Sequence, residues 1–199
     1  HLHIVVEKYI NKESIVLEAG CHIGTHSVKL SKLCKKLYCF EPLKTSAHVL
    51  NENLILNNCN NTIVYDSGLP DVNGTTKFSW VGSDNPGASG LRDNPMGDLY
   101  NSPQISNENN YNVQLVNIDS LQLSKLDFIK LDVEGYEVKV ILGGLETIKK
   151  YKPVITLECW SDHKSNASIQ HTTIQFQFLL DLGYKLNRIS HCDWLFLPI

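Results

Sequence analysis

Apolar runs alternate with amphipathic segments along most of this chain. Short runs rich in β-branched and other apolar residues, as buried strands require, recur from residue 15 onward. Between them, apolar residues return at the spacing of helices that pack one face on a sheet. This alternation predicts a parallel sheet with right-handed crossovers, and hence an α/β fold.

The expected elements follow that alternation in chain order. Strands are predicted at 15–17, 37–40, 62–65, 75–81, 113–116, 127–132, 154–158, 184–189 and 194–197. Helices are predicted at 1–10, 25–33, 46–56, 136–142, 145–151 and 174–182. The segment from Gly82 to Asn110 is rich in Gly, Pro, Asn, Asp and Ser, and we interpret it either as a cover on the substrate side or as a disordered segment.

One loop dominates the candidate chemistry. The strand that ends at Leu17 runs into the sequence Glu-Ala-Gly-Cys-His-Ile-Gly-Thr-His, which ends at His26. Gly20 and Gly24 have no β-carbon, so the backbone can turn sharply and a ligand can approach the main chain, while amides at the start of the next helix face that ligand. The loop therefore predicts a nucleotide-type site.

Acidic residues follow several of the predicted parallel strands. Glu18, Glu41, Asp66, Asp132 and Glu158 would meet at the carboxyl edge of the sheet, where open α/β sheets bind ligands. Taken singly, each is equally explained as a solvated strand end. Glu41 lies about 20 residues after the glycine loop, the position from which doubly wound domains hold both ribose hydroxyls. That spacing alone equally permits an NAD-dependent enzyme.

Composition narrows the class of partner. The net charge of -3 and the lack of a long Lys/Arg run argue against nucleic acid and favour a small or neutral substrate. The six cysteines form no Cys-x-x-Cys pair, so the sequence suggests neither zinc nor a disulfide framework, and reduced thiols in the cytoplasm are expected. No apolar run reaches about 18 residues and no signal-peptide pattern occurs, which argues against a spanning or secreted protein.

The chain is expected to fold as a single domain over residues 1–199, long enough to bury a substantial core. It opens at His1 rather than at an initiator methionine, so one interpretation is a domain excised from a longer, multidomain protein. That interpretation bears on partners, because an adjoining module could supply the substrate.

Several stretches together resemble one enzyme family. They are Leu-Glu-Ala-Gly-Cys-His-Ile-Gly-Thr-His at 17–26, Phe-Glu-Pro at 40–42, Ile-Lys-Leu-Asp-Val-Glu-Gly-Tyr-Glu at 129–137, and then Gly143-Gly144, Pro153 and Leu157-Glu158. In this order they are similar to the successive motifs of the FkbM-type S-adenosylmethionine-dependent O-methyltransferases. The resemblance covers residues 15 to about 158. It implies a class I methyltransferase (Rossmann-like) three-layer sandwich, with a mostly parallel seven-stranded sheet whose last strand is antiparallel.

The resemblance also assigns parts of the cofactor, S-adenosylmethionine (SAM), to residues of this chain. It implies that the amino-acid part is held by Glu18, Gly20, Cys21 and Gly24. It implies further that Glu41 holds the ribose and that Asp66 with Ser67 holds the adenine edge. His22 in the loop and Asp132 at the opposite strand end are additional candidate contacts of the cofactor.

Methyl transfer to an aliphatic hydroxyl benefits from a base, because a neutral alcohol is a poor nucleophile. The candidate bases are Glu134, Asp132, His22, His26 and His163. We favour Glu134, because His163 also fits a solvated loop residue, while His22 and His26 also fit surface positions at a helix start. His191 is expected to be structural or exposed.

A metal is a second possibility at the same edge. Asp132 and Glu158 end strands that should be neighbours, so both could offer oxygen ligands to Mg²⁺ or Mn²⁺ and leave Glu134 as the base. The alternatives are that Asp132 contacts the cofactor or caps the helix at Tyr136, and that Glu134 hydrogen-bonds within the turn before Gly135.

The sequence therefore predicts a SAM-dependent O-methyltransferase that acts on a hydroxyl, with a sugar in a glycan or glycosylated metabolite as the favoured acceptor. An O-methyltransferase of another small metabolite is the alternative among methyltransferases. An NAD-binding oxidoreductase would require a tighter Gly-x-Gly-x-x-Gly loop, and an inactive SAM-binding module would bind SAM without turnover. Fusion to glycosyltransferase modules that make the acceptor is a further hypothesis.

Overall fold

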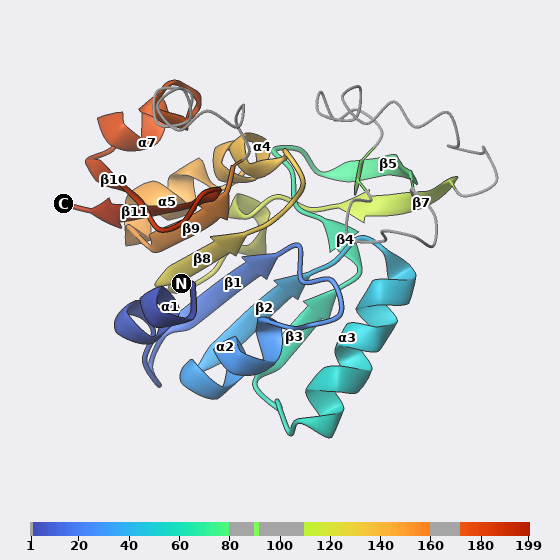
Figure 1. Ribbon diagram of the computed structural model, residues 1–199. Helices are drawn as coiled ribbons and strands as arrows, with labels where there is room; N and C mark the ends of the chain where they lie inside the picture. Colours follow the sequence, from blue (N-terminus) through green and yellow to red (C-terminus); the bar gives the residue numbers. More distant parts are fainter. Residues whose placement is uncertain (1, 80–89, 92–109, 160–171) are drawn as a thin grey trace.

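A seven-stranded sheet forms the centre of the computed structural model, which describes residues 2–79, 90–91, 110–159 and 172–199. Its strands are β1 (Ile15–Ala19), β2 (Lys36–Phe40), β3 (Thr62–Tyr65), β8 (Phe128–Leu131), β9 (Val154–Glu158), β10 (Tyr184–Arg188) and β11 (Asp193–Pro198). Their spatial order is β10-β11-β9-β8-β1-β2-β3 (Figure 1). The five strands from β9 to β3 run parallel, and β11, the last strand of the chain, is antiparallel to both neighbours. The predicted sheet is confirmed.

Helices cover both faces of this sheet and complete the three layers. The first face packs against α1 (Leu2–Tyr9), α2 (Ser27–Leu33) and α3 (Lys44–Leu56), and the second against α4 (Glu137–Leu142), α5 (Leu145–Tyr151) and α7 (Gln177–Asp181). Successive residues of a strand point to opposite faces, so Val16 of β1 enters the first core and Leu17 the second. Both residues are fully buried, as the continuous apolar run predicts.

A second, smaller sheet lies beyond the ends to which β1, β2 and β3 point (Figure 1). Its strands, in the order β4-β7-β5-β6, are β4 (Ser67–Gly68), β7 (Asn110–Leu115), β5 (Gly74–Ser79) and β6 (Gly90–Leu91). The strands predicted at 75–81 and 113–116 correspond to β5 and β7, which pair with each other, antiparallel, outside the central sheet. Their pairing places this sheet beside the candidate ligand edge.

The remaining differences from the sequence prediction are local. The connection after β7 contains the short 3₁₀ helix η3 (Asp119–Leu121), and the helix predicted at 174–182 is interrupted by a turn at Phe176. Apart from β6 and Asn110, the predicted cover from Gly82 to Asn110 lies outside the described residues. Within the described ranges, no helix has the length and apolar character needed to cross a bilayer.

Candidate active site

The loop between β1 and α2 is pressed against two neighbouring strands. Gly20 donates its amide to the carbonyl of Phe40 at the end of β2, over 3.0 Å. On its other side, the carbonyl oxygen of Asp132 lies 1.6 Å from the position that a Cβ of residue 20 would occupy. The φ of Gly20 is +78°, so both space and conformation require glycine. Glycine is required at this position because the backbone that leaves β8 passes directly against residue 20.

Glu41 ties the end of β2 to this loop. One carboxylate oxygen accepts a hydrogen bond from the amide of His22 (2.7 Å) and the other from the amide of Leu43 (2.9 Å). Burial raises the pKa of Glu41, and the two amide hydrogen bonds oppose that rise. The carboxyl group is therefore fixed in orientation, while each oxygen keeps a lone pair that can accept from a ribose hydroxyl.

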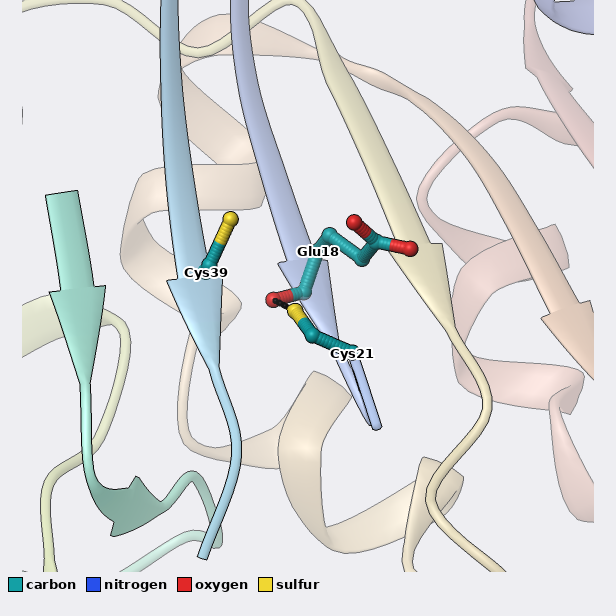
Figure 2. A group of neighbouring side chains, drawn as sticks. All are labelled: Glu18, Cys21 and Cys39. Atoms are coloured by element: carbon teal, nitrogen blue, oxygen red, sulfur yellow. Dashed lines mark hydrogen bonds between the residues drawn. The ribbon is translucent and has the colours of Figure 1, made fainter. Parts of the chain in front are cut away.

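The side chains of Glu18 and Cys21 lie beneath the loop rather than at its surface. Glu18 is 0% exposed, and its Oε2 accepts a hydrogen bond from Ser27 Oγ (2.6 Å). Cys21 is also buried, and its Sγ donates to the carbonyl of Glu18 (3.3 Å; Figure 2). The sequence predicts both residues as contacts of the amino-acid part of the cofactor. In the structure both side chains are buried and support the loop from below, and their contact with the cofactor stays a prediction.

Glu18, Cys21 and Cys39 form the one group of three potential metal ligands that converges among the described residues (Figure 2). Their ligand atoms lie within 4.8 Å of one another. Burial raises the pKa of the Cys21 thiol well above its usual value, so the thiol keeps its proton, whereas a metal needs the thiolate. Glu18 is already engaged by Ser27 and Lys130. We therefore assign this cluster to packing, in keeping with six free cysteines.

The predicted adenine edge consists of one exposed and one buried residue. Asp66, after β3, is exposed, whereas Ser67 begins β4 and is 4% exposed. The Ser67 hydroxyl has no hydrogen-bond partner in the part of the chain that the structure describes. Just before them, the rings of Phe40 and Tyr65 stack with centroids 4.6 Å apart. A buried hydroxyl without a partner is costly, so Ser67 fits a position that a ligand completes.

Three carboxyl groups follow the adjacent strands β8 and β9. Asp132 and Glu134 come directly after β8, Glu158 closes β9, and the two strands pair in parallel. Glu158 lies beside Asp132, because Leu131 pairs with Leu157 in the register of the two strands, and its Oε1 accepts from Cys192 Sγ (3.3 Å). Burial and then Asp132 raise the pKa of Glu158 to about 8, and the same two causes raise that of Glu134. The expectation that β8 and β9 are neighbours is confirmed.

Glu137 shapes this edge, and the sequence analysis does not single it out. Its Oε1 accepts hydrogen bonds from the amides of Val133 (3.1 Å) and Gly135 (3.3 Å). These bonds close the turn in which Glu134 adopts a φ of +52°. The sequence analysis offers Glu134 as the residue that fixes the turn and Asp132 as the cap of the helix. In the structure the hydrogen bonds in this turn are made by Glu137. The sequence does contain a signal for this role of Glu137. An acidic residue in the first turn of a helix, directly after a tight turn, is typical of N-terminal capping.

We expect Glu137→Gln to remove part of the pH dependence of stability. Burial raises the pKa of Glu137 from 4.5 to about 7 despite its hydrogen bonds. The folded state therefore binds this proton more tightly than the unfolded state does, so the stabilisation is present below about pH 4.5 and is lost as the pH rises through about 7. Between these pH values the free energy of unfolding of the wild type should fall by about 3 kcal/mol more than that of the variant.

Urea unfolding at a series of pH values measures this difference. Glu146→Gln is the matched control, because Glu146 is exposed on α5 and pairs with the exposed Lys149. Equal pH slopes for the wild type and Glu137→Gln would contradict the prediction.

Lys130 is a second residue whose role the sequence analysis does not assign. It lies in the middle of the sheet, is 4% exposed, and stands directly opposite Glu18 in the register of β8 with β1. Its Nζ lies 3.4 Å from Glu18 Oε1 and 3.5 Å from Asp132 Oδ2. Burial alone would lower the pKa of Lys130, but the two carboxylates raise it overall, so the side chain is charged. In the sequence, this role is indicated by a single lysine inside an otherwise apolar strand.

The candidate histidines are distributed along different segments. His22 and His26 are half-buried in and after the glycine loop, His191 is exposed before β11, and His163 lies outside the described residues. The groups that gather where β8 and β9 end are carboxyl groups. The candidate base is therefore one of these carboxyl groups.

The donors at this edge do not suit the Mg²⁺ or Mn²⁺ that the sequence analysis considers. Asp132 is paired with the buried Lys130 ammonium, and Glu158 Oε1 accepts a hydrogen bond from Cys192 Sγ. A hard divalent cation binds ionised oxygens and must compete with any proton or cation already there. We derive no step through a metal.

The strand order and the place of the antiparallel strand are those of class I, Rossmann-like methyltransferases. Within that class, the family model "Methyltransferase FkbM domain" matches residues 18–186. The chain belongs to this family, which confirms the resemblance of its motifs.

Named relatives agree with this membership. The 2-O-methyltransferase NoeI of Sinorhizobium fredii (strain NBRC 101917 / NGR234) is 26% identical over 154 residues, which cover 72% of this chain and 63% of that protein. The crystal structure of an FkbM methyltransferase from Methylobacillus flagellatus KT has a TM-score of 0.61 at 16% identity, over 93% of this chain and 43% of that one. A putative methyltransferase from Streptococcus mutans, in complex with SAH, has a TM-score of 0.52 at 13% identity, over 98% and 93%.

The identity and the coverage of these matches decide which conclusions follow from them. At 16% and 13% identity the structural likeness shows the fold alone. The chain spans 63% of NoeI and 43% of the FkbM crystal structure, less than two thirds of either.

Proposed function

We propose that this domain transfers a methyl group from SAM to a hydroxyl oxygen, with a sugar of a glycan or glycosylated metabolite as the acceptor. The observation that carries the proposal is the sharing of one sheet edge by two features. The glycine loop with Glu41 lies at the ends of β1 and β2, and the carboxyl groups of Asp132, Glu134 and Glu158 lie at the ends of β8 and β9. That NoeI is a 2-O-methyltransferase supports oxygen as the receiving atom.

The described residues fit SAM at several points. Glu41 would accept from the ribose hydroxyls, the unpartnered hydroxyl of Ser67 would bind at the adenine, and the loop backbone at Gly20 would meet the amino-acid part. Asp132, whose side chain is 38% exposed, would face the cofactor ammonium. When bound, SAM supplies a methyl group on a positively charged sulfur, and as the acceptor oxygen bonds to that carbon the C–S electron pair stays on sulfur and the hydroxyl proton must leave.

The carboxyl groups beyond β8 and β9 would receive that proton. A base works best when its pKa lies near the working pH, because it must be ionised and still hold the proton well. An ordinary carboxylate is too weak a base for this, whereas the pKa of about 8 at Glu158 is well matched. Glu134 stays a candidate for the same role, because its pKa is also raised. Holding the hydroxyl beside the methyl donor supplies the rest of the acceleration.

Calorimetric titration with S-adenosylhomocysteine (SAH) tests the cofactor half of the proposal. We expect the wild type to bind and Glu41→Gln to bind at least about 10-fold more weakly, since a neutral amide cannot accept from both the His22 and Leu43 amides and loses charge-assisted bonds to ribose. Glu52→Gln, on the exposed side of α3, should bind like the wild type. Failure of the wild type to bind SAH would overturn the proposal.

A methyl-transfer screen tests the acceptor half. Labelled SAM is offered with free sugars, glycans and non-carbohydrate alcohols, each with and without EDTA. We expect a methylated sugar hydroxyl, formed equally with EDTA. SAH binding without any transfer would favour an inactive SAM-binding module, transfer only to other alcohols would reassign the acceptor, and loss with EDTA that Mg²⁺ restores would reinstate a metal.

A further inference from the structure

A buried hydrogen bond joins the two ends of the cofactor loop. Ser27, the first residue of α2, donates its hydroxyl to Glu18 Oε2 in β1 over 2.6 Å, and both residues are 0% exposed. The two residues are 9 positions apart in the sequence, so the bond encloses the whole loop from Ala19 to His26. The proposed cofactor contacts do not include Ser27.

We propose that Ser27 is a positioning residue, which holds Glu18 and thereby keeps the loop in the shape that receives the amino-acid part of the cofactor. Because Ser27 is 0% exposed, it acts through Glu18 and the loop rather than by touching a ligand. Its effect on cofactor affinity rests on the proposed function. Its effect on the loop does not.

The two halves of the loop are held in different ways. In the first half, the amides of Gly20 and His22 donate to the end of β2. In the second half, Gly24 donates its amide to the carbonyl of Cys21 (2.9 Å), which forms a turn, and the chain then enters α2 at Ser27. The bond from Ser27 to β1 therefore fixes the point at which the second half ends.

Glu18 is a firm anchor for this bond. It lies in β1, which is paired with β2 on one side and with β8 on the other. Its second oxygen, Oε1, lies 3.4 Å from the buried ammonium of Lys130. A hydrogen bond to a carboxylate is stronger than one between neutral groups, and both partners here are removed from water. Without the Ser27 hydroxyl, the start of α2 loses its attachment to the sheet at this point.

A loosened loop should bind the cofactor more weakly, because only the fraction of molecules with the correct loop shape is competent to bind. Loss of one hydrogen bond to a charged group should lower that fraction by about 10-fold. The effect should be confined to the amino-acid part of the cofactor. Glu41 and Ser67, which would hold the ribose and the adenine, belong to the end of β2 and to β4.

Calorimetric titration of Ser27→Ala with two ligands tests this inference. SAH carries the amino-acid part, whereas 5′-methylthioadenosine has the same adenosine and sulfur without it. We expect Ser27→Ala to bind SAH about 10-fold more weakly than the wild type and 5′-methylthioadenosine within about 2-fold of it. Ser31→Ala is the matched control, because Ser31 lies on the same helix and its buried hydroxyl donates to Asn61 Oδ1 (2.8 Å) rather than to β1. It should bind both ligands like the wild type.

Glu18→Gln distinguishes a positioning role from a direct contact of Glu18 with the cofactor. Its amide oxygen can still accept from Ser27, so SAH affinity should fall less than in Ser27→Ala. A greater loss in Glu18→Gln than in Ser27→Ala would make Glu18 itself the contact and overturn the inference. Equal SAH affinity of the wild type and Ser27→Ala would also overturn it, as would an equal loss for SAH and 5′-methylthioadenosine.

Hydrogen exchange of the free protein tests the loop without any ligand. The Gly24 amide should exchange about 10-fold faster in Ser27→Ala than in the wild type or Ser31→Ala, whereas the Gly20 amide, which donates to Phe40, should keep its rate. A general loss of stability would accelerate both amides. Unchanged exchange at Gly24 would overturn the role of Ser27, and faster exchange there in a protein whose wild type binds no SAH would sink the proposed function and leave that role standing.

Discussion

Gly20→Ala is expected to disrupt the cofactor loop and to abolish SAH binding. The new Cβ would lie 1.6 Å from the carbonyl oxygen of Asp132, and that obstacle is backbone at the end of a central strand, not a side chain that can rotate away. The φ of +78° adds conformational strain. We expect a loss of more than about 4 kcal/mol of folding free energy, a large part of what a domain of this kind possesses. Urea unfolding and SAH calorimetry measure the two effects.

Variants of two other glycines distinguish the effect of the steric clash with Asp132 from the effect of the positive φ. Gly183 has a φ of +82° with nothing within 4 Å of its Cβ position, so Gly183→Ala should cost only about 1 kcal/mol and leave SAH binding intact. At Gly24, with a φ of +92°, the obstacle is the flexible end of the Leu50 side chain at 2.7 Å, so Gly24→Ala should fall between them. Equal losses in Gly20→Ala and Gly183→Ala would show that the contact with Asp132 is not the reason.

The fold could be predicted from periodicity because each central element carries its own signal. Runs such as Val154–Glu158 are mainly apolar or β-branched, and the helices between strands return apolar residues to one face. Pairing over long sequence distances carries no such local signal. The strands at Gly74–Ser79 and Asn110–Leu115 look alike whether they join the central sheet or each other, and only their tertiary pairing decides.

The candidate site could be located from the sequence, but the direction of its side chains could not. The motif resemblance treats Glu18 as a cofactor contact, whereas the pleat places it on the same face as the buried Val16. Lys130 and Glu137 lie within the motif at 129–137, but the resemblance assigns neither of them a role. Their roles depend on Glu18 of another strand and on the amides of a turn, which a linear pattern does not bring together. The excised-domain and glycosyltransferase-fusion hypotheses stay predictions.

Glu158→Gln is expected to lower kcat by about 10²- to 10⁴-fold, the range for loss of a general base, while SAH affinity changes little. Glutamine has the same shape, and its amide oxygen can still accept from Cys192, so the fold should persist. Burial and Asp132 raise the pKa of Glu158 to about 8, and only the ionised form can take the proton. The kcat of the wild type should therefore rise with pH through about 8, and that of the variant should be flat there.

Glu134→Gln is the matched comparison, because Glu134 lies at the same edge and also has a raised pKa. If Glu158 is the base, Glu134→Gln should lose less than about 10-fold in kcat and keep the pH profile of the wild type. The reverse outcome, an active Glu158→Gln and an inactive Glu134→Gln, would return the base to Glu134, as the sequence favours. The position of Glu158 argues for the first outcome, because burial and the neighbouring Asp132 raise its pKa to about 8, closer to the working pH than an ordinary carboxylate.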